Sequence, residues 1–576
     1  MKDKKKAAGF LIEWGIPLLL SFAFFILPLL IISPVYALND DLQLRDILSG
    51  AASGRPDFHT VYMRAPLAML LAGLYTILPS LPWLGILECG AVVLCGFIML
   101  RSVQKKSLVN GWPYAVGLLL FTAFYLLMLR EIFILPHYTL VAALCGGCGI
   151  WCLLDMGSGA EGMGSLRNPS KIELFLPIFL LLHCEQIRSQ VFLMVLPFAV
   201  LALVYILLTR FGWEKRKEWK KSIKPLLIFC GAYIVLLLIH VAAYTPWEWK
   251  DYLALNDART ELYDYTGIWE SDEAKAYYAG YGVDENSFPL YRDYDLLPVS
   301  DARTERLKTL AAWREPGRSL SGAERFKNVL WELRKRSFGG DLYGIPLLLI
   351  YLLALLKHLK KEQRKGLLPL AAAFLLHFAF YGYLLWNGRT PERVTDSLYL
   401  IQFLFLSHVL LKDLRKGSVR SLLWPSLACI VFFIASFFTH PGEYYVKQSA
   451  VNHRQDVVYS YMAERPDSLF LLETYATVDR TEKVATAKGA ENALLLGGWL
   501  YGSPLQDAKL KSFGYESREE LFTRSGAYVV FREGAGLEPG ELTSYLEAYY
   551  PDGARLEPVT MLMGGEDVFL IFMLSK

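Results

Sequence analysis

Two adjacent carboxylates, Asp40 and Asp41, follow the first long apolar segment of the chain. They stand in the run Leu38–Leu44, where the chain is expected to leave a membrane on its outer side. A charge held near hydrocarbon is costly, so it tends to face a cavity or a functional site. Such a carboxylate can deprotonate a hydroxyl group, or it can hold a divalent cation such as Mg²⁺ or Mn²⁺ through its oxygens. Asp40 and Asp41 are therefore the catalytic candidates and the candidate metal ligands.

Further polar residues are expected at the same depth and on the same side of the membrane. These candidates for binding substrate are His59, Glu131, Glu185, Arg188, Arg389 and Arg393. Arginine binds phosphate bidentately and stabilises the charge that develops when a sugar–phosphate bond breaks. Because the tail of a lipid-linked donor lies in the bilayer, its phosphate would arrive at this depth. The combination indicates sugar transfer from a lipid-linked donor.

Each of these side chains also has a structural interpretation. The histidines could simply support the fold. The carboxylates and arginines could pair locally: Asp40 and Asp41 with the amides that begin a helix at about 42–49, Glu185 with Arg188, and Arg389 and Arg393 with Glu392 and Asp396. Sequence alone leaves both interpretations open.

The composition is that of a protein with many membrane spans. Of its 576 residues, 54% are hydrophobic, against about 45–50% in ordinary soluble domains, and the mean hydropathy is +0.31. Eleven spans are predicted, at 14–38, 83–101, 113–129, 133–154, 171–185, 190–209, 225–244, 342–358, 367–386, 394–411 and 421–439. The short apolar stretch 66–79 is predicted to be an interfacial or re-entrant helix.

Lysine and arginine gather in every second connection, for example at 210–224 and 357–365, so the N-terminus is predicted inside and the C-terminus outside. The expected location is the cytoplasmic membrane of a bacterium. The first span could instead be a cleaved signal peptide, which leaves the sidedness of the rest unchanged. The net charge of +3 gives no indication of nucleic-acid binding. The eight cysteines lie in or beside apolar spans, so no disulfide framework is expected.

Two long polar segments are predicted outside the membrane. The loop 245–341, like the shorter outer loop 39–82, belongs to a transmembrane domain at 1–439. The Trp, Tyr and acidic residues of the loop 245–341 suit the binding of sugar rings by stacking or, alternatively, form an aromatic belt at the membrane interface. The segment 440–576 is predicted to be an extracytoplasmic α/β domain. Its strands are expected at 468–472, 527–531 and 568–572, and its helices at 517–523 and 540–550.

No nucleotide-binding, metalloprotease, kinase or hydrolase motif is found, so a reaction must draw on an activated donor and transport on a gradient. With its Asn39-Asp40-Asp41 after the first span, its juxtamembrane helix, its many spans and its C-terminal outer domain, the chain resembles the GT-C superfamily of integral-membrane glycosyltransferases. The resemblance implies that Asp40 or Asp41 is the base or a metal-linked residue. It also implies a polyprenyl-phosphate-linked sugar as donor and a cell-envelope glycan or lipid as acceptor.

Three other functions remain open. A transporter or flippase of lipid-linked glycans predicts broken helices and charges at mid-membrane depth. A polysaccharide polymerase or ligase predicts that Arg and His of a large outer loop do the chemistry. A non-catalytic envelope protein predicts that substitutions at Asp40 and Asp41 are silent.

Overall fold

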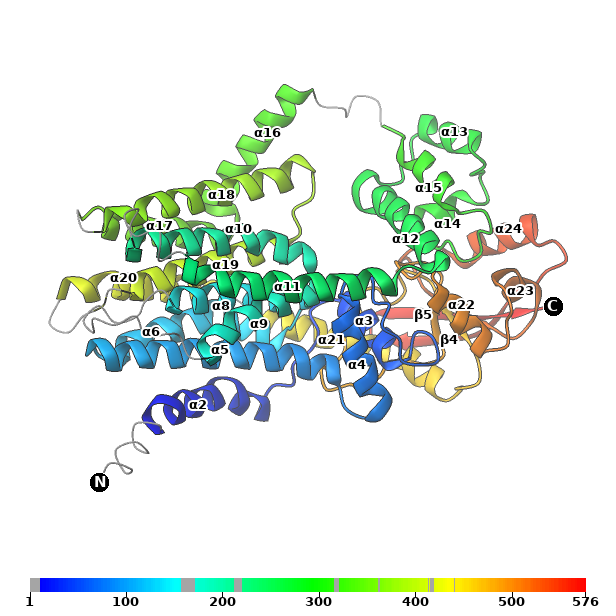
Figure 1. Cartoon of the computed structure of the whole chain (residues 1–576). Helices are drawn as coiled ribbons and strands as arrows, with labels where there is room; N and C mark the ends of the chain where they lie inside the picture. The colour runs from blue at the N-terminus through cyan, green and yellow to red at the C-terminus, as the bar shows by residue number, and fades with distance from the viewer. Residues whose placement is uncertain are drawn as a thin grey trace.

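The computed structural model describes residues 11–156, 171–211, 220–314, 321–360, 363–412, 414, 419–439 and 441–576. Several basic segments on which the predicted orientation depends, at 1–10, 157–170 and 212–219, lie outside the described residues. The long helices run side by side in one bundle, and the C-terminal elements gather at one end of it (Figure 1).

Each of the eleven predicted spans contains a helix, although the first helix ends at Leu30 and not at 38, and the span predicted at 133–154 is a helix only from Tyr138. Nine helices of the described residues are long and apolar enough to cross a membrane: Ile12–Leu30, Trp83–Asn110 (α5), Tyr114–Ile134 (α6–α7), Tyr138–Met156 (α8), Ser189–Thr209 (α10 and the turn after it), Leu226–Ala243 (within α11), Arg364–Trp386 (α18), Glu392–Leu411 (α19) and Ser421–Ala463 (α20–α21). The other two are shorter helices, α9 (Lys171–Ile187) and α17 (Gly344–His358). The stretch expected at 66–79 is α4 (Ala65–Ile77). The prediction of a polytopic helical membrane protein is confirmed.

Helices α8 and α19 form the centre of the bundle. In their most apolar windows, 78% of the α8 residues and 89% of the α19 residues are buried. Glycine lets neighbouring helices approach α8 closely: a Cβ at Gly146 would lie 2.5 Å from Val195, and one at Gly147 would lie 2.5 Å from Leu404. These two most buried helices, α8 and α19, begin at Tyr138 and Glu392, close in sequence to the predicted site residues Glu131 and Arg393.

The C-terminal region contains a five-stranded sheet with the order β2-β1-β3-β5-β4. Its strands are β1 (Phe470–Leu472), β2 (Ala493–Leu495), β3 (Tyr528–Arg532), β4 (Arg555–Gly564) and β5 (Asp567–Ser575). Strand β1 pairs in parallel with β2 and β3, whereas β5 pairs antiparallel with β3 and β4. The helices are α21 (Pro441–Ala463), α22 (Pro504–Ser512), α23 (Arg518–Thr523) and α24 (Pro539–Tyr549). The predicted α/β character is confirmed.

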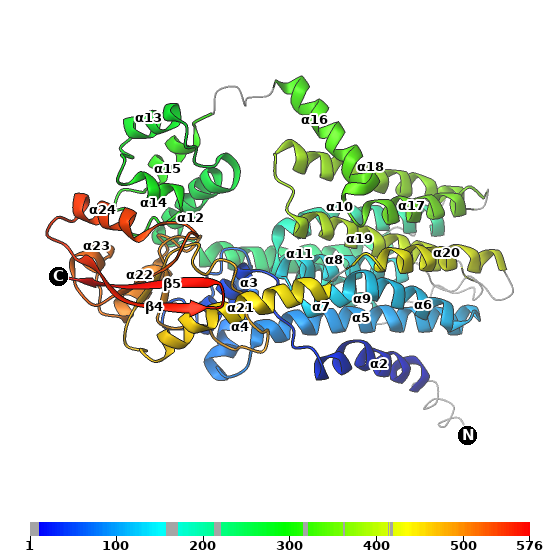
Figure 2. The same cartoon turned by 180° about the vertical axis from the view of Figure 1, so that it is seen from behind.

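The long loop 245–341 is helical and divides into two parts. Helices α12 (Trp247–Thr260), α13 (Asp272–Gly280), α14 (Phe288–Arg292) and α15 (Thr304–Ala311) lie against the C-terminal region, while α16 (Gly322–Lys335) lies against the membrane bundle (Figure 2). Tyr278 and Tyr291 of the loop share one hydrophobic core with Leu471, Val529 and Tyr545. Several aromatic residues considered for sugar stacking are therefore core residues. The segment 247–311 and residues 464–576 form one structure, hereafter the extramembrane unit.

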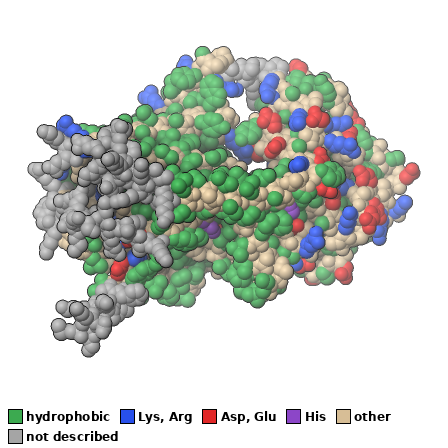
Figure 3. All heavy atoms as spheres, viewed as in Figure 1, with side chains coloured by type: hydrophobic (Ala, Val, Ile, Leu, Met, Phe, Trp, Pro, Cys, Tyr) green, Lys and Arg blue, Asp and Glu red, His purple; other side chains and the backbone are tan. Residues whose placement is uncertain are grey.

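Figure 3 shows apolar side chains covering the bundle and charged side chains concentrated over the extramembrane unit. An apolar surface suits the bundle, because a bilayer admits few unpaired charges, and a charged surface suits the extramembrane unit in water.

Two buried acids join the loop to the sheet. Asp295 Oδ1 accepts hydrogen bonds from the amide (2.9 Å) and the hydroxyl (2.7 Å) of Thr474, and Glu473 Oε1 accepts from the amide of Tyr475 (2.9 Å). Asp295 and Glu473 are 0% and 1% exposed. Burial and the charge of Glu473 raise the pKa of Asp295 well above its ordinary value. Burial, with a further contribution from Asp293, raises the pKa of Glu473 to about 7.

This pair predicts that the loop–sheet contact weakens as the pH rises. The folded state retains a proton that the unfolded acids release near pH 4, so the stabilisation is present at low pH and lost as the pH rises through about 7. Between pH 5.5 and 8 we expect the opening free energy of 288–297 to fall by about 1–3 kcal/mol, measured by hydrogen exchange corrected for intrinsic rates. Asp295→Asn should flatten this dependence. An equal slope in the variant would contradict the assignment.

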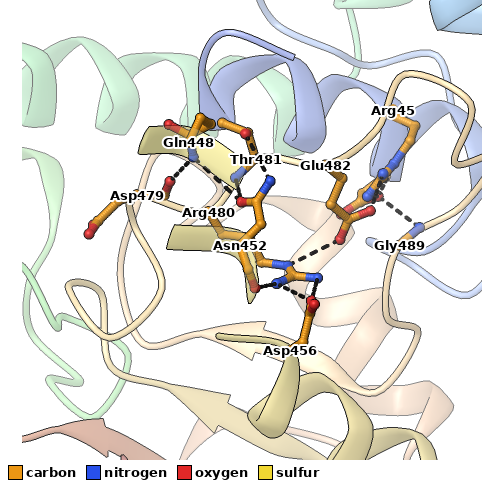
Figure 4. A network of polar contacts seen from close by, with 10 residues as sticks. Arg45, Gln448, Asn452, Asp456, Asp479, Arg480, Thr481, Glu482 and Gly489 are labelled. Atoms are coloured by element: carbon orange, nitrogen blue, oxygen red, sulfur yellow. Dashed lines mark hydrogen bonds and ion pairs between the residues drawn. The ribbon is translucent and has the colours of Figure 1, made fainter. Parts of the chain in front are cut away.

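A contact between α3 (Asn39–Ser49) and the extramembrane unit surrounds Arg45, as Figure 4 shows. Arg45 is 1% exposed, and its guanidinium pairs with Glu482 (2.5 Å) and Asp46 (2.7 Å). Asp46 also accepts a hydrogen bond from the amide of Gly489 (3.1 Å). The helix that carries Asp40 and Asp41 is thereby attached to the extramembrane unit.

Arg45→Met should destabilise the protein by about 3 kcal/mol, the low end for breaking a buried ion pair, because it leaves the partly buried carboxylates of Asp46 and Glu482 without their cation. Thermal unfolding in nanodiscs measures the effect. The double variant Arg45→Met/Glu482→Gln should recover part of the loss, since one of the unpaired charges is then removed. Equal stability of the single variant and the wild type would show that the ion pair does not anchor α3.

Candidate functional site

Asp40 and Asp41 lie in the first turn of α3, which begins at Asn39 rather than at about 42. The N-cap residue, Leu38, provides no side-chain cap. Asp40 forms an ion pair with Arg393 (3.5 Å), and its side chain is 20% exposed. Asp41 is fully buried, and its Oδ1 accepts a hydrogen bond from the amide of Tyr138 (3.0 Å). These contacts to other helices replace the helix-capping role that the sequence left open.

Tyr138, the first residue of α8, connects Asp41 with Arg188. Its hydroxyl accepts a hydrogen bond from Nη1 of Arg188. The Arg188 guanidinium also lies 4.7 Å from the ring centre of Tyr138 and 5.7 Å from that of Tyr62. The buried amide and hydroxyl of one tyrosine therefore hold a carboxylate and a cation in the same place.

Glu88 of α5 is a member of the site that sequence reasoning missed. It is 1% exposed and interacts with Asp41. In the described part of the chain, Asp41 Oδ2 and both Glu88 oxygens have no hydrogen bond of ordinary geometry. Glu88 is the only acidic residue within the predicted span 83–101, and an ionisable residue inside a span is itself a functional signal.

Burial favours the protonated form of Asp41. Burial raises its pKa to about 8, the charge of Asp40 raises it further, and the hydrogen bond from Tyr138 opposes the change. Two buried acids in contact cannot both ionise, so they share a proton. His137, whose Nε2 lies 3.9 Å from Asp41 Oδ2, has its pKa lowered by burial and by Arg393 and Arg188. Burial therefore favours the uncharged forms of both Asp41 and His137.

The two arginines predicted to bind phosphate lie apart. Arg393, at the start of α19, reaches Asp40, and its Nε is buried without a hydrogen bond among the described residues. Arg389 pairs with Asp264 of the loop (2.8 Å) and lies over the ring of Tyr265 (5.5 Å). Both arginines thus bind to other elements rather than to Glu392 and Asp396.

Glu185 pairs with residues outside the group formed by Asp40, Asp41 and Tyr138. Its Oε1 accepts from Nε of Arg64 at 2.8 Å, and its Oε2 accepts from Gln186 at 2.5 Å. The local Glu185–Arg188 pair considered from the sequence is replaced by Arg64, which lies 121 positions away and has no sequence signal.

His59 and Glu131 belong to other surroundings. The ring of His59 stacks on Trp249 at 3.9 Å, with Nδ1 against Asp57 (2.7 Å) and Nε2 against the carbonyl of Ala243 (3.1 Å). These contacts correspond to the structural interpretation of His59, in which the side chain supports the fold. Glu131 of α7 interacts electrostatically with Arg130 and Glu392.

The structure therefore brings four of the eight predicted residues together with four others. We call this group the Asp40 cluster: Asp40, Asp41, Tyr62, Glu88, His137, Tyr138, Arg188 and Arg393. It contains two cations, Arg188 and Arg393, which can bind an anionic ligand. Its one partly exposed carboxylate, Asp40, can accept a proton from a second ligand bound beside the first.

A metal-binding role for Asp40 and Asp41 stays a prediction. Within the described ranges, no group of three or more His, Cys, Asp or Glu side chains is placed to hold a metal ion. Oδ1 of Asp41 accepts the hydrogen bond from the Tyr138 amide. No step of the proposed reaction below depends on a metal.

Comparison with known proteins gives one structural similarity. No family model matches the chain, and no curated protein matches it. Among solved structures, the chain is similar to the crystal structure of ArnT from Cupriavidus metallidurans bound to undecaprenyl phosphate. The alignment has a TM-score of 0.41 and 12% sequence identity, and it covers 98% of each chain.

Proposed function

We propose that the protein is a membrane glycosyltransferase. It would transfer a sugar from a polyprenyl-phosphate-linked donor to a glycan or lipid acceptor of the cell envelope. The observation that supports this most is the pairing of the partly exposed Asp40 with Arg393, 3.5 Å away, beside a second cation, Arg188. Carboxylate and guanidinium groups at the end of a membrane bundle match an acceptor hydroxyl and a lipid phosphate.

In this reaction Asp40 is the general base. It accepts the proton of the acceptor hydroxyl, whose oxygen forms a bond to the anomeric carbon of the sugar. The bond between that carbon and the phosphate oxygen breaks, and its electron pair leaves with the polyprenyl phosphate. Arg393 and Arg188 stabilise this charge, because prearranged donors act strongly where water is largely excluded.

Asp41 and Glu88 position the site in this proposal. Since the pair shares a proton, it places less negative charge beside the phosphate than two carboxylates would. Asp41 holds the amide of Tyr138, whose hydroxyl in turn holds Arg188.

The proposed location is the bacterial cytoplasmic membrane, with the Asp40 cluster and the extramembrane unit on the outer side. The alternation of basic connections supports this orientation. Labelling of single cysteines in the unit, for example Ser544→Cys, with a membrane-impermeant reagent on whole cells tests it: labelling is expected, and labelling only after lysis would reverse the orientation.

The reaction is tested with the full-length protein in nanodiscs and a panel of polyprenyl-phosphate sugars with a cell-envelope glycan fraction as acceptor. Transfer of label, with release of polyprenyl phosphate, is expected for at least one donor. Translocation of a labelled lipid-linked sugar in proteoliposomes without any transfer would instead indicate a flippase.

A further inference from the structure

Two residues of the described chain that are not glycine have a left-handed backbone conformation, and a series of contacts connects them. Val61, with a φ angle of +63°, directly precedes Tyr62 of the Asp40 cluster. Tyr294, with a φ angle of +64°, lies between α14 and α15 of the extramembrane unit. Such a conformation is costly for tyrosine and especially for the β-branched valine, so the surrounding structure must impose it. Strain of this kind at two connected positions indicates a functional contact.

The sheet and the loop impose the conformation of Tyr294. Its carbonyl oxygen accepts a hydrogen bond from the hydroxyl of Thr474, which follows β1 (3.3 Å). A Cβ at Gly497 would overlap that oxygen, so the close approach requires glycine. The ring of Tyr294 stacks on the ring of Tyr263, with their centres 4.1 Å apart. These contacts hold the hydroxyl of Tyr294 in one place.

The hydroxyl of Tyr294 binds Arg259 of α12, which is 5% exposed. Each of the three guanidinium nitrogens donates to a neutral group: Nη1 to Tyr294 (2.8 Å), Nε to Asn256 (3.1 Å) and Nη2 to Thr260 (2.9 Å). These hydrogen bonds fix the plane of the guanidinium without neutralising its charge. A buried and prearranged cation acts strongly on its neighbours, because little water screens it.

Tyr62 connects Arg259 with the Asp40 cluster. Burial raises the pKa of the Tyr62 hydroxyl, and among the charged groups around it Arg259 opposes this rise most. The ring of Tyr62 packs against Trp499 of the extramembrane unit (5.0 Å between centres) and against Tyr138 of the bundle (6.4 Å). The guanidinium of Arg188 lies over the rings of both tyrosines. The extramembrane unit therefore contacts the side chain on which the Arg188 cation rests.

We infer that Arg259 and Tyr294 are positioning residues of the proposed glycosyltransferase. From the extramembrane unit they hold the Tyr62 side chain, and Tyr62 holds the guanidinium of Arg188 beside the leaving phosphate. The inference rests on the proposed function and adds that the membrane bundle alone does not complete the site. Its physical basis is that a cation stabilises a transition state well only when it is held in the correct place beforehand.

Tyr294→Phe removes only the hydroxyl that Arg259 contacts, and Tyr263→Phe is its matched control. Tyr263 carries the other ring of the stacked pair, and its hydroxyl donates to the carbonyl of Tyr291 within the loop (2.9 Å). Sugar transfer by the full-length protein in nanodiscs is measured over a range of donor concentrations. We expect Tyr294→Phe to lower kcat by about tenfold with an unchanged KM for the donor, and Tyr263→Phe to change kcat by less than about twofold.

Hydrogen exchange tests the same contact without an assay of transfer. In the segment 60–64, the amides of Val61 and Arg64 are hydrogen-bonded to other parts of the protein (3.0 and 2.9 Å). Tyr294→Phe should speed the exchange of this segment by at least about threefold, because Tyr62 loses its support. Tyr263→Phe should leave the exchange unchanged.

Arg259→Lys is the second variant, which is used if Tyr294→Phe does not fold. Lysine keeps the charge but not the three fixed donors, so the same two effects are expected. Wild-type rates and wild-type exchange at 60–64 in both Tyr294→Phe and Arg259→Lys would overturn the inference. Faster exchange in Tyr294→Phe together with no transfer by the wild type would support the contact and contradict the proposed function instead.

Discussion

If the proposed reaction is correct, replacing Asp40 with Asn should lower sugar transfer by about 10²–10⁴-fold, the usual contribution of a general base, while the protein keeps its fold. The expected loss is large because Asp40 is the only partly exposed carboxylate of the Asp40 cluster, and Asn cannot accept the acceptor's proton. Transfer of labelled sugar from the active donor measures the effect. Size-exclusion chromatography and thermal unfolding in nanodiscs check the fold.

Asp41→Asn is the matched control for this prediction. The side chain of Asp41 is buried, which raises its pKa to about 8, and Asn retains the oxygen that accepts from the Tyr138 amide. We expect a loss within about tenfold, since Asn also changes the contact with Glu88. If Asp41→Asn abolishes transfer and Asp40→Asn does not, the base has been assigned to the wrong residue. Full activity of both variants would exclude the enzyme hypothesis in this form.

Arg393→Gln should lower transfer by about 10²–10³-fold, the effect of removing one donor that stabilises a developing charge. Arg389→Gln removes the same charge four positions earlier, yet Arg389 pairs with Asp264 and is 34% exposed, so its loss should change transfer by less than about threefold. The rates of both variants are measured with saturating donor and acceptor.

Arg393→Lys separates geometry from charge in the same experiment. Lysine keeps the charge but not the fork of donors, so partial activity between Gln and Arg is expected. Similar losses for Arg389→Gln and Arg393→Gln would indicate a general electrostatic attraction of the donor rather than a contact in the transition state.

The sequence was sufficient for the parts of this protein that depend on local composition. Long apolar segments predicted the nine candidate membrane helices of the described residues, because a bilayer requires a continuous apolar stretch of a given length. The strands β1, β3 and β5 were predicted from short apolar runs that contain aromatic residues, whereas β2 (Ala493–Leu495) has no aromatic or β-branched residue and β4 contains Glu557 and Pro558, so neither carried a clear strand signal.

Only the tertiary structure decided which polar residues meet. Arg389 and Arg393 are four positions apart and similar in sequence context, yet one pairs with the loop at Asp264 and the other with Asp40. Glu185 pairs with Arg64 across 121 positions, and Asp41 contacts Glu88 of another helix. Such contacts depend on how helices pack around α8 and α19, and helix packing is set by side-chain shape over the whole bundle rather than by local spacing. The sequence determined the membrane helices and the type of chemistry available; the packing determined that Asp40, Arg188 and Arg393 share one site.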